Sequence, residues 1–128
     1  MPALEVLQLS GNGFTGTIPS LDLDVNNRPI SQLVNLSLAH NRLSGPIPLS
    51  LQRYTGMFYL DLSFNKLTGT TEQMTNYTLV AQTNQSSGTV TALHLNVNRI
   101  SGPFPPYFHE ATYINILSGN HFSCSALA

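Results

Sequence analysis

The sequence predicts a solenoid of short parallel strands, because one pattern recurs along most of the chain. The pattern is an apolar residue, two free positions, apolar, free, apolar, two free, Asn, free, apolar, free and Gly. It occurs four times and then once in a degraded form, at 4–16, 33–45, 57–69, 90–102 and 112–124. Repeats of this kind bury their apolar faces only against their neighbours. The alternating apolar positions before the Asn are typical of a short strand.

Length and charge argue against several other classes of protein. The 128 residues are enough for one stacked core and too few for two globular domains. The net charge is −1, and we interpret the Lys and Arg residues as scattered, without a basic stripe: Arg28, Arg42, Arg53, Lys66 and Arg99. Nucleic-acid binding is therefore not expected. No apolar run reaches the ~18 residues of a membrane span, so no membrane contact is expected within this segment.

The repeats organise the whole chain. We expect one domain over 1–128 that is a segment of a longer protein, because the first repeat begins with an uncapped apolar face at Leu4. The third repeat lacks an Ile-Pro pair after Gly69, so its coil is expected to deform there. The repeats extend over about 4–32, 33–56, 57–89, 90–111 and 112–124, with a polar insertion over about 70–88.

Each position of the pattern has a physical role. The apolar residues stack from coil to coil, and the Gly residues permit the backbone angles of the next bend. The returning side of each coil is expected to be irregular or 3₁₀, since no segment has the caps and length of a regular helix. An Asn amide both donates and accepts hydrogen bonds, so the repeated Asn residues are expected to form a ladder that satisfies buried backbone groups. They are Asn12, Asn41, Asn65, Asn98 and Asn120.

The fifth copy departs from the pattern. Asn115 falls where an inward apolar residue belongs, while Ile114 and Ile116 fall on outward positions. Either the strand is shifted by one residue, which exchanges its faces, or the two Ile residues are exposed. Burial of a large aliphatic side chain is favourable by roughly 1.5–3 kcal/mol. We therefore favour a local shift or cover by a following segment.

The repeats resemble the plant-type extracellular leucine-rich repeat, whose consensus contains L-x-x-N-x-L-x-G-x-I-P. The best matches are NGFTGTIP (12–19), NRLSGPIP (41–48) and NRISGPFP (98–105), and the resemblance covers about 4–124. It implies an α/β horseshoe solenoid of about five coils, right-handed, with a parallel sheet on its concave face. It also implies kinship with the ectodomains of receptor-like kinases, receptor-like proteins and polygalacturonase-inhibiting proteins. GNHFSC (119–124) resembles the lead into that family's cysteine cap, so Cys124 is either half of a cap disulfide or a free terminal thiol.

Outward strand positions are the candidate binding surface. By the template they line the concave sheet, where a rigid array of side chains can read an extended peptide or a protein surface. The alternative is a solvated sheet face without a partner in this segment. The tentative ligand-binding residues are Gln8, Ser37, Tyr59, Asp61, His94 and Asn96.

Catalysis, metal binding and cofactors are not expected. Ser37, Asp61 and His94 share one template position in successive coils, but a catalytic triad needs the base between the nucleophile and the carboxylate, and here Asp61 is in the middle. The four His residues occupy different template positions, whereas a closed metal site needs three or four convergent ligands. A kinase domain would belong to the parent protein and not to this chain.

Three Asn-x-Ser/Thr sequons begin at Asn35, Asn76 and Asn84. The last two lie in the polar insertion, where a glycan would project without touching the core. If the protein is secreted, we expect glycosylation at Asn76 and Asn84 before Asn35.

The sequence therefore predicts a non-catalytic recognition module from the extracellular part of a receptor-like or secreted protein. Its partners would be a protein or peptide ligand, or a co-receptor, and its location would be outside the cell or in the ectodomain of a plasma-membrane protein. Two alternatives stay open. One is an inhibitor of a cell-wall-degrading hydrolase, and the other is a structural cell-surface solenoid without a dedicated ligand.

Overall fold

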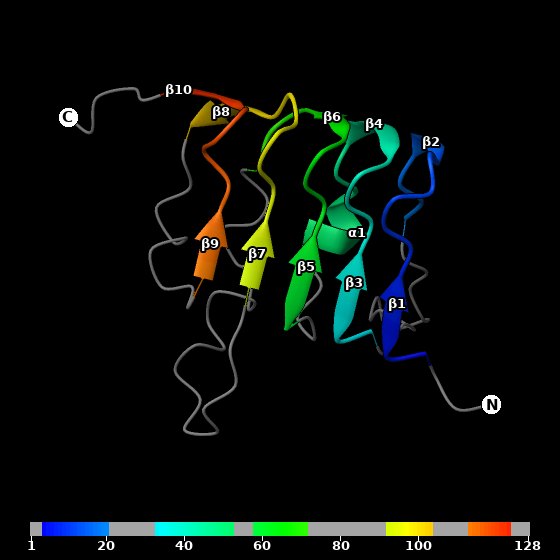
Figure 1. The fold of residues 1–128 in the computed structure, drawn as a ribbon. Helices are drawn as coiled ribbons and strands as arrows, with labels where there is room; N and C mark the ends of the chain where they lie inside the picture. The colour runs from blue at the N-terminus through cyan, green and yellow to red at the C-terminus, as the bar shows by residue number, and fades with distance from the viewer. Residues whose placement is uncertain (1–3, 21–32, 53–57, 72–91, 104–112, 124–128) are drawn as a thin grey trace, which may run out of the picture.

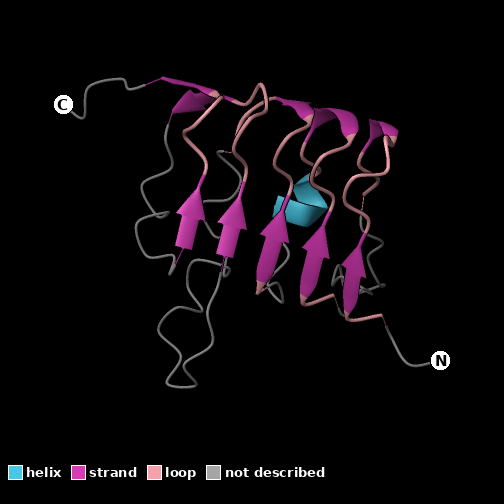
Figure 2. Cartoon of the chain, viewed as in Figure 1, coloured by secondary structure: helices cyan, strands magenta, loops and turns pink. Residues whose placement is uncertain are grey.

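The computed structural model describes residues 4–20, 33–52, 58–71, 92–103 and 113–123. These segments form coils stacked side by side, with the two chain ends at opposite ends of the stack (Figure 1). Each coil passes through a strand of one sheet, turns at a template Asn, and enters a strand at a second edge (Figure 2). The solenoid predicted from the repeats is confirmed.

The main sheet is parallel, and its strands follow the order of the repeats. They are β1 (Val6–Gln8), β3 (Asn35–Ser37), β5 (Tyr59–Asp61), β7 (Ala92–His94) and β9 (Tyr113–Asn115), in the order β1-β3-β5-β7-β9. The register aligns equivalent template positions without offset through β7, because the central Leu of each strand is paired with the central Leu of the next. This alignment places the outward side chains of successive coils in rows.

A second set of strands follows the template Asn residues, and the sequence analysis did not predict it. One sheet contains β2 (Thr15–Thr17), β4 (Arg42–Pro46) and β6 (Lys66–Thr68); another contains β8 (Ser101–Pro103) and β10 (His121–Ser123). Hydrogen bonds from Arg99 N to Leu67 O (2.7 Å) and from Ser101 N to Gly69 O (2.9 Å) connect β6 to β8. Extended backbone leaving each Asn therefore pairs with the coil before it.

The returning side of the second coil contains α1 (Leu49–Gln52), a four-residue α-helix, instead of the expected irregular or 3₁₀ turn. Gln52 N donates to Pro48 O at 2.9 Å, which is the i→i−4 bond of an α-helix. The Gln52 side chain also donates from Nε2 to Ile47 O at 2.7 Å. This side-chain bond satisfies a carbonyl that precedes the helix.

The core consists of aliphatic columns that run through the stack. Leu36, Leu60 and Leu93 form one column and are 4%, 0% and 0% exposed. Leu67 and Ile100 continue a second column behind the corner, and both are 0% exposed. At roughly 1.5–3 kcal/mol for each buried aliphatic side chain, this stacking is the main favourable contribution to the fold.

The template Asn side chains bridge neighbouring coils through backbone groups. Asn65 Nδ2 donates to Leu38 O of the preceding coil at 2.9 Å and to Leu62 O of its own coil at 3.1 Å. Its Oδ1 accepts from Leu43 N at 3.0 Å. The amides of Asn41, Asn65, Asn98 and Asn120 each join two coils in this way, whereas Asn12 Nδ2 donates within its own coil. The Asn12 backbone N–H donates to Asn41 Oδ1 at 3.0 Å. The bond that Asn65 Oδ1 accepts recurs at the other interfaces, where its donor is the backbone N–H two residues after the Asn of the preceding coil. These bonds run from Phe14 N to Asn41, from Leu67 N to Asn98 and from Ile100 N to Asn120.

The fifth coil is shifted by one residue relative to the template. Ile114 pairs in register with Leu93, and Asn115 with His94. Ile116 is 2% exposed, while Leu117 is 58% exposed. Asn120 Nδ2 donates to Ile116 O, four residues back, whereas Asn98 Nδ2 donates to Leu95 O, three residues back. The turn before Asn120 thus absorbs one extra residue, so that Ile114 instead of Asn115 takes the register position of Leu93.

The third coil keeps its path through Thr71, although it was expected to deform after Gly69. Gly69 has φ +81°, close to the +76° of Gly45, and Thr68 remains paired with Pro46. Thr71 is fully buried in the place that Ile47 fills one coil earlier. At Gly45 the positive φ accompanies a close approach, because an added Cβ would lie 2.8 Å from Thr17 Cγ2. The remainder of the polar insertion lies outside the described residues.

The residue before each inner template Asn has a left-handed backbone. His40, Phe64 and Val97 have φ values of 54°, 56° and 57°. For a residue with a Cβ this conformation costs roughly 1–2 kcal/mol, and it is a marked outlier for a β-branched residue such as Val97. The corner of the solenoid therefore carries backbone strain in three consecutive coils.

Candidate functional site

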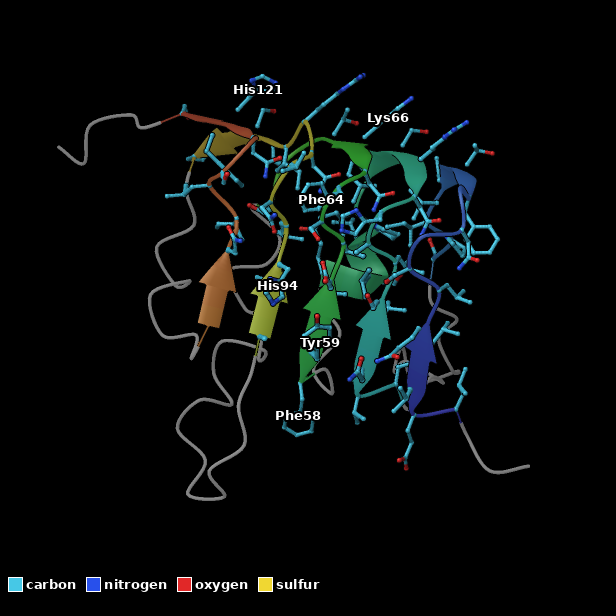
Figure 3. All side chains as sticks on the ribbon, in the orientation of Figure 1. Phe58, Tyr59, Phe64, Lys66, His94 and His121 are labelled. Atoms are coloured by element: carbon cyan, nitrogen blue, oxygen red, sulfur yellow. The ribbon has the colours of Figure 1, made fainter. Side chains whose placement is uncertain are left out.

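The sheet face, meaning the outer surface of the strands β1, β3, β5, β7 and β9, brings three of the predicted residues together. Tyr59 and Asp61 project from β5, and His94 projects from β7 directly beside Asp61 in register. The Tyr59 and His94 rings are 5.6 Å apart between centroids and inclined at 48° (Figure 3). All three side chains are half-buried, so each presents part of its surface to solvent.

Asp61 fixes the geometry of this cluster. Tyr59 Oη donates to Asp61 Oδ2 at 3.2 Å, and Ser63 donates to Oδ1 from Oγ at 2.6 Å and from N at 3.0 Å. Desolvation by burial raises the pKa of Tyr59, and the charge of Asp61 and its hydrogen bond raise it further. Tyr59 is therefore a neutral phenol at physiological pH, held in place by the carboxylate. The cluster is a rigid polar and aromatic surface.

The other predicted ligand-binding residues differ in accessibility. Gln8 is exposed at the N-terminal end of the sheet face. Ser37 is 8% exposed, and its Oγ lies 2.6 Å from Ser10 Oγ in a hydrogen bond. Asn96 is 9% exposed, and its Oδ1 is covered without a hydrogen-bond partner in the described part of the chain. Ser37 and Asn96 thus offer little surface to a ligand.

Ser37, Asp61 and His94 share one row of the sheet, as the template predicted. The strand order places Asp61 between Ser37 and His94, which is not the nucleophile–base–carboxylate order of a triad. Over the described residues, no group of three or more His, Cys, Asp or Glu side chains is arranged to hold a metal ion. The arrangement is suited to contact and not to proton transfer from a serine.

Of the three sequon Asn residues and Cys124, only Asn35 lies in the described part of the chain. Asn35 begins β3 in the interior of the main sheet, and its Oδ1 is buried without a hydrogen-bond partner among the described residues. Asn76, Asn84 and Cys124 lie outside the described residues. The preference for the two sequons of the insertion over Asn35 stays a prediction.

The structure overturns the interpretation of the basic residues as scattered. Arg42, Lys66 and Arg99 each follow a template Asn directly, and all three are exposed along one edge of the stack. His121 follows Asn120 in the same way, and Figure 3 shows Lys66 and His121 at this edge. The signal was present in the sequence as a cation one residue after the Asn, but it becomes a row only when the coils stack.

The model for the leucine-rich repeat matches this chain over residues 3–25 and 32–54. This match agrees with the stacked coils and the bridging Asn side chains. The chain folds as a leucine-rich repeat solenoid.

Known plant proteins contain similar leucine-rich repeat segments. The chain is 47% identical over 68 residues to a protein named "Probable LRR receptor-like serine/threonine-protein kinase" from Arabidopsis thaliana, a match over 52% of this chain and 6% of that protein. Among solved structures, the BIR3–SERK2 complex of Arabidopsis thaliana matches with TM-score 0.64 and 27% identity, over 98% of this chain and 60% of that one. A plant ice-binding protein matches with TM-score 0.64 and 26% identity, over 90% and 33%.

The chain thus spans a small part of the curated receptor-like kinase that it matches and about a third of the matched ice-binding protein. Other matched structures are ectodomains of plant receptor kinases, so the expected kinship with extracellular leucine-rich repeats is confirmed. Within the described segments, no helix has the length and apolar character to cross a membrane.

Proposed function

We propose that this leucine-rich repeat segment is a recognition module that binds a protein or peptide partner on its sheet face, as part of a receptor-like ectodomain. The supporting observation is the cluster of Tyr59, Asp61 and His94, in which a carboxylate holds a Tyr ring beside an imidazole on the adjacent strand. Tyr is among the residues that contribute most to protein interfaces, because its large rigid ring loses little conformational entropy on binding. The likeness to a receptor-like kinase and to the BIR3–SERK2 complex agrees with such a role.

The proposal is tested by selecting 12-residue peptides from a random library on the secreted chain, followed by affinity measurement with three variants. Tyr59→Ala and His94→Ala remove the two rings of the cluster, and Leu49→Ala removes an exposed side chain on α1, on another surface. We expect peptides whose affinity falls at least tenfold with either ring variant and stays within twofold with Leu49→Ala. Peptides that bind all variants equally, or a library that yields none, would refute a recognition site on this face.

The similarity to a plant ice-binding protein raises a second candidate function. Fold does not determine function, so the surface must decide. Within one row of the sheet face, the side chain differs from coil to coil. One such row contains, in register, Gln8, Ser37, Asp61 and His94. A repetitive ice-binding array would show the same small side chain in each coil. We therefore expect no thermal hysteresis from this chain, and a measured freezing-point gap would reverse the order of the two candidates.

Inhibition of a cell-wall-degrading hydrolase would use the same sheet face for an enzyme partner. Addition of the chain to an endopolygalacturonase assay distinguishes this case. Loss of inhibition with Tyr59→Ala, and not with Leu49→Ala, would identify the partner as such an enzyme.

A further inference from the structure

The residues that flank the template Asn residues form a second surface, which the sheet face does not include. We call it the corner strip. It has an apolar and aromatic row, which precedes the Asn residues, and a cationic row, which follows them: His40, Phe64 and Val97, with Arg42, Lys66 and Arg99. All six side chains are exposed.

The apolar row is ordered and accessible. The His40 and Phe64 rings are stacked, with centroids 4.3 Å apart and planes within 10°. Phe64 is 42% exposed and Val97 is 37% exposed, so neither is a core residue. Figure 3 shows Phe64 between the strand of Tyr59 and the edge occupied by Lys66. In the fifth coil, Leu117 lies in the turn before Asn120 and is 58% exposed.

The backbone indicates that these side chains are not present for the sake of the fold. In the first and last described coils the same position is Gly11 and Gly119, with φ values of 72° and 74°. The three inner coils adopt the same left-handed backbone with side chains that Gly would replace without strain. Strained residues that carry exposed apolar side chains are characteristic of contact surfaces. The row is thus an exposed and strained surface in three consecutive coils.

The cationic row is held by backbone hydrogen bonds, and its charges have no acidic partner among the described residues. Arg42 N donates to Phe14 O, and Arg99 N donates to Leu67 O, both at 2.7 Å. Among the described residues the acidic side chains are those of Glu5 and Asp61, and no ion pair joins either one to this row. Asp61 instead accepts hydrogen bonds from Tyr59 and Ser63. Arg42, Lys66 and Arg99 thus place one positive charge on each of three successive coils, without internal compensation in the described part of the chain.

We propose that the corner strip binds an extended acidic peptide segment of a partner protein. Its carboxylates would contact Arg42, Lys66 and Arg99, and its apolar side chains would lie on the Phe64 ring and Val97. Complementary charge would favour encounter and orientation, while burial of the apolar row would supply affinity that salt does not screen. This site is separate from the sheet-face cluster and adds a second partner surface to the same coils.

The apolar row favours a peptide over an anionic polysaccharide. A polysaccharide with regularly spaced carboxylates would satisfy the cations but would leave Phe64 and Val97 uncovered. A peptide that alternates acidic and apolar residues matches both rows at once.

The test measures fluorescence anisotropy of labelled 12-residue peptides with the complete chain at low and moderate salt. The principal probe alternates Glu and Leu; one comparison probe replaces Glu by Gln, another replaces Leu by Ser, and a decamer of galacturonic acid represents the polysaccharide. We expect the principal probe to bind at least tenfold more tightly than any of the other three. Equal binding of the Leu-to-Ser probe, tighter binding of the galacturonate decamer, or no binding of the principal probe at 1 mM would each overturn the proposal.

Variants of the chain locate the site. Lys66→Gln combined with Arg99→Gln is expected to weaken the principal probe at least tenfold and to reduce its salt dependence. Val97→Gly is expected to weaken it at least threefold without lowering the urea midpoint, because Gly removes the strain together with the side chain. Arg28→Gln, which does not follow a template Asn, is the matched charge control, and Tyr59→Ala is the control for the sheet face. If Arg28→Gln or Tyr59→Ala weakened the probe as much as the strip variants did, the corner strip would not be the site.

Discussion

Replacement of the central bridging amide, Asn65→Ala, should destabilise the chain by about 3 kcal/mol. The substitution leaves the buried N–H of Leu43 without its acceptor, which costs roughly 1–3 kcal/mol. It also removes the Nδ2 bonds to Leu38 O, Leu62 O and Ser63 O. These carbonyls retain other donors, for example Asn41 Nδ2 for Leu38 O and Asn98 Nδ2 for Leu62 O. Loss of the three Asn65 Nδ2 bonds therefore adds only about 1 kcal/mol in total.

The matched control is Asn12→Ala, the same change at the same template position in the first coil. Asn12 is exposed, and its Nδ2 donates within its own coil to Leu9 O and Ser10 O. We expect it to cost less than about 1 kcal/mol, because water replaces both bonds. Urea unfolding followed by circular dichroism gives both values, and the slope with denaturant should stay unchanged. On heating, the Asn65 variant should unfold about 10 °C lower.

Equal losses of stability in the two variants, to within about 0.5 kcal/mol, would contradict this prediction. They would mean that the amide bridges between coils contribute no more than an exposed side chain does. A third variant, Asn65→Asp, separates the contribution of the accepting Oδ1 from that of the donating Nδ2. It keeps the acceptor for Leu43 N–H but sets a carboxylate against three carbonyls, so it should be at least as destabilising as Asn65→Ala.

Two further predictions concern the corner and the sheet face. Gly45→Ala should cost at least about 1 kcal/mol more in urea unfolding than Gly16→Ala, because both have positive φ but only at Gly45 does the added Cβ meet Thr17 Cγ2 at 2.8 Å; equal losses would contradict the close approach. The pKa of Tyr59 should lie above that of free Tyr in an ultraviolet titration from which the Tyr59→Phe titration is subtracted. Asp61→Asn should lower that pKa only in part, since burial is the larger cause of the shift. Because the folded-state pKa is raised, this contribution to stability is present below about pH 10 and is lost as the pH rises through the folded pKa; an unshifted titration would exclude the Tyr59–Asp61 contact.

The pattern of residues predicted the fold because the pattern is itself the packing rule. A strand that buries alternate aliphatic residues against an identical strand needs the same residues at the same positions in each coil. The columns of Leu36, Leu60 and Leu93 follow directly from that requirement. The template Asn residues could likewise be placed at the corners, since each turn leaves backbone groups that an amide can satisfy.

The candidate site was predicted only in part. Register alone placed Tyr59, Asp61 and His94 in adjacent positions, so their proximity could be inferred. The closure over Ser37 and Asn96 could not, because exposure on a sheet depends on side chains of neighbouring coils and on the turn that follows. The hydrogen bonds from Ser63 and Tyr59 to Asp61 depend in the same way on side-chain positions that the template leaves free.

The sequence by itself determined the repeating unit, its inward residues and the corner Asn residues, because each of these is local and recurs at a fixed place in the pattern. Tertiary structure alone decided the second row of strands and the alignment of Arg42, Lys66 and Arg99 along one edge, and it selected the one-residue shift at Ile114 from the alternatives that the sequence left open. Those features arise from contacts between coils, in which free template positions of different repeats become neighbours. A residue that looks isolated along the chain is then part of a surface, and here that surface is the corner strip.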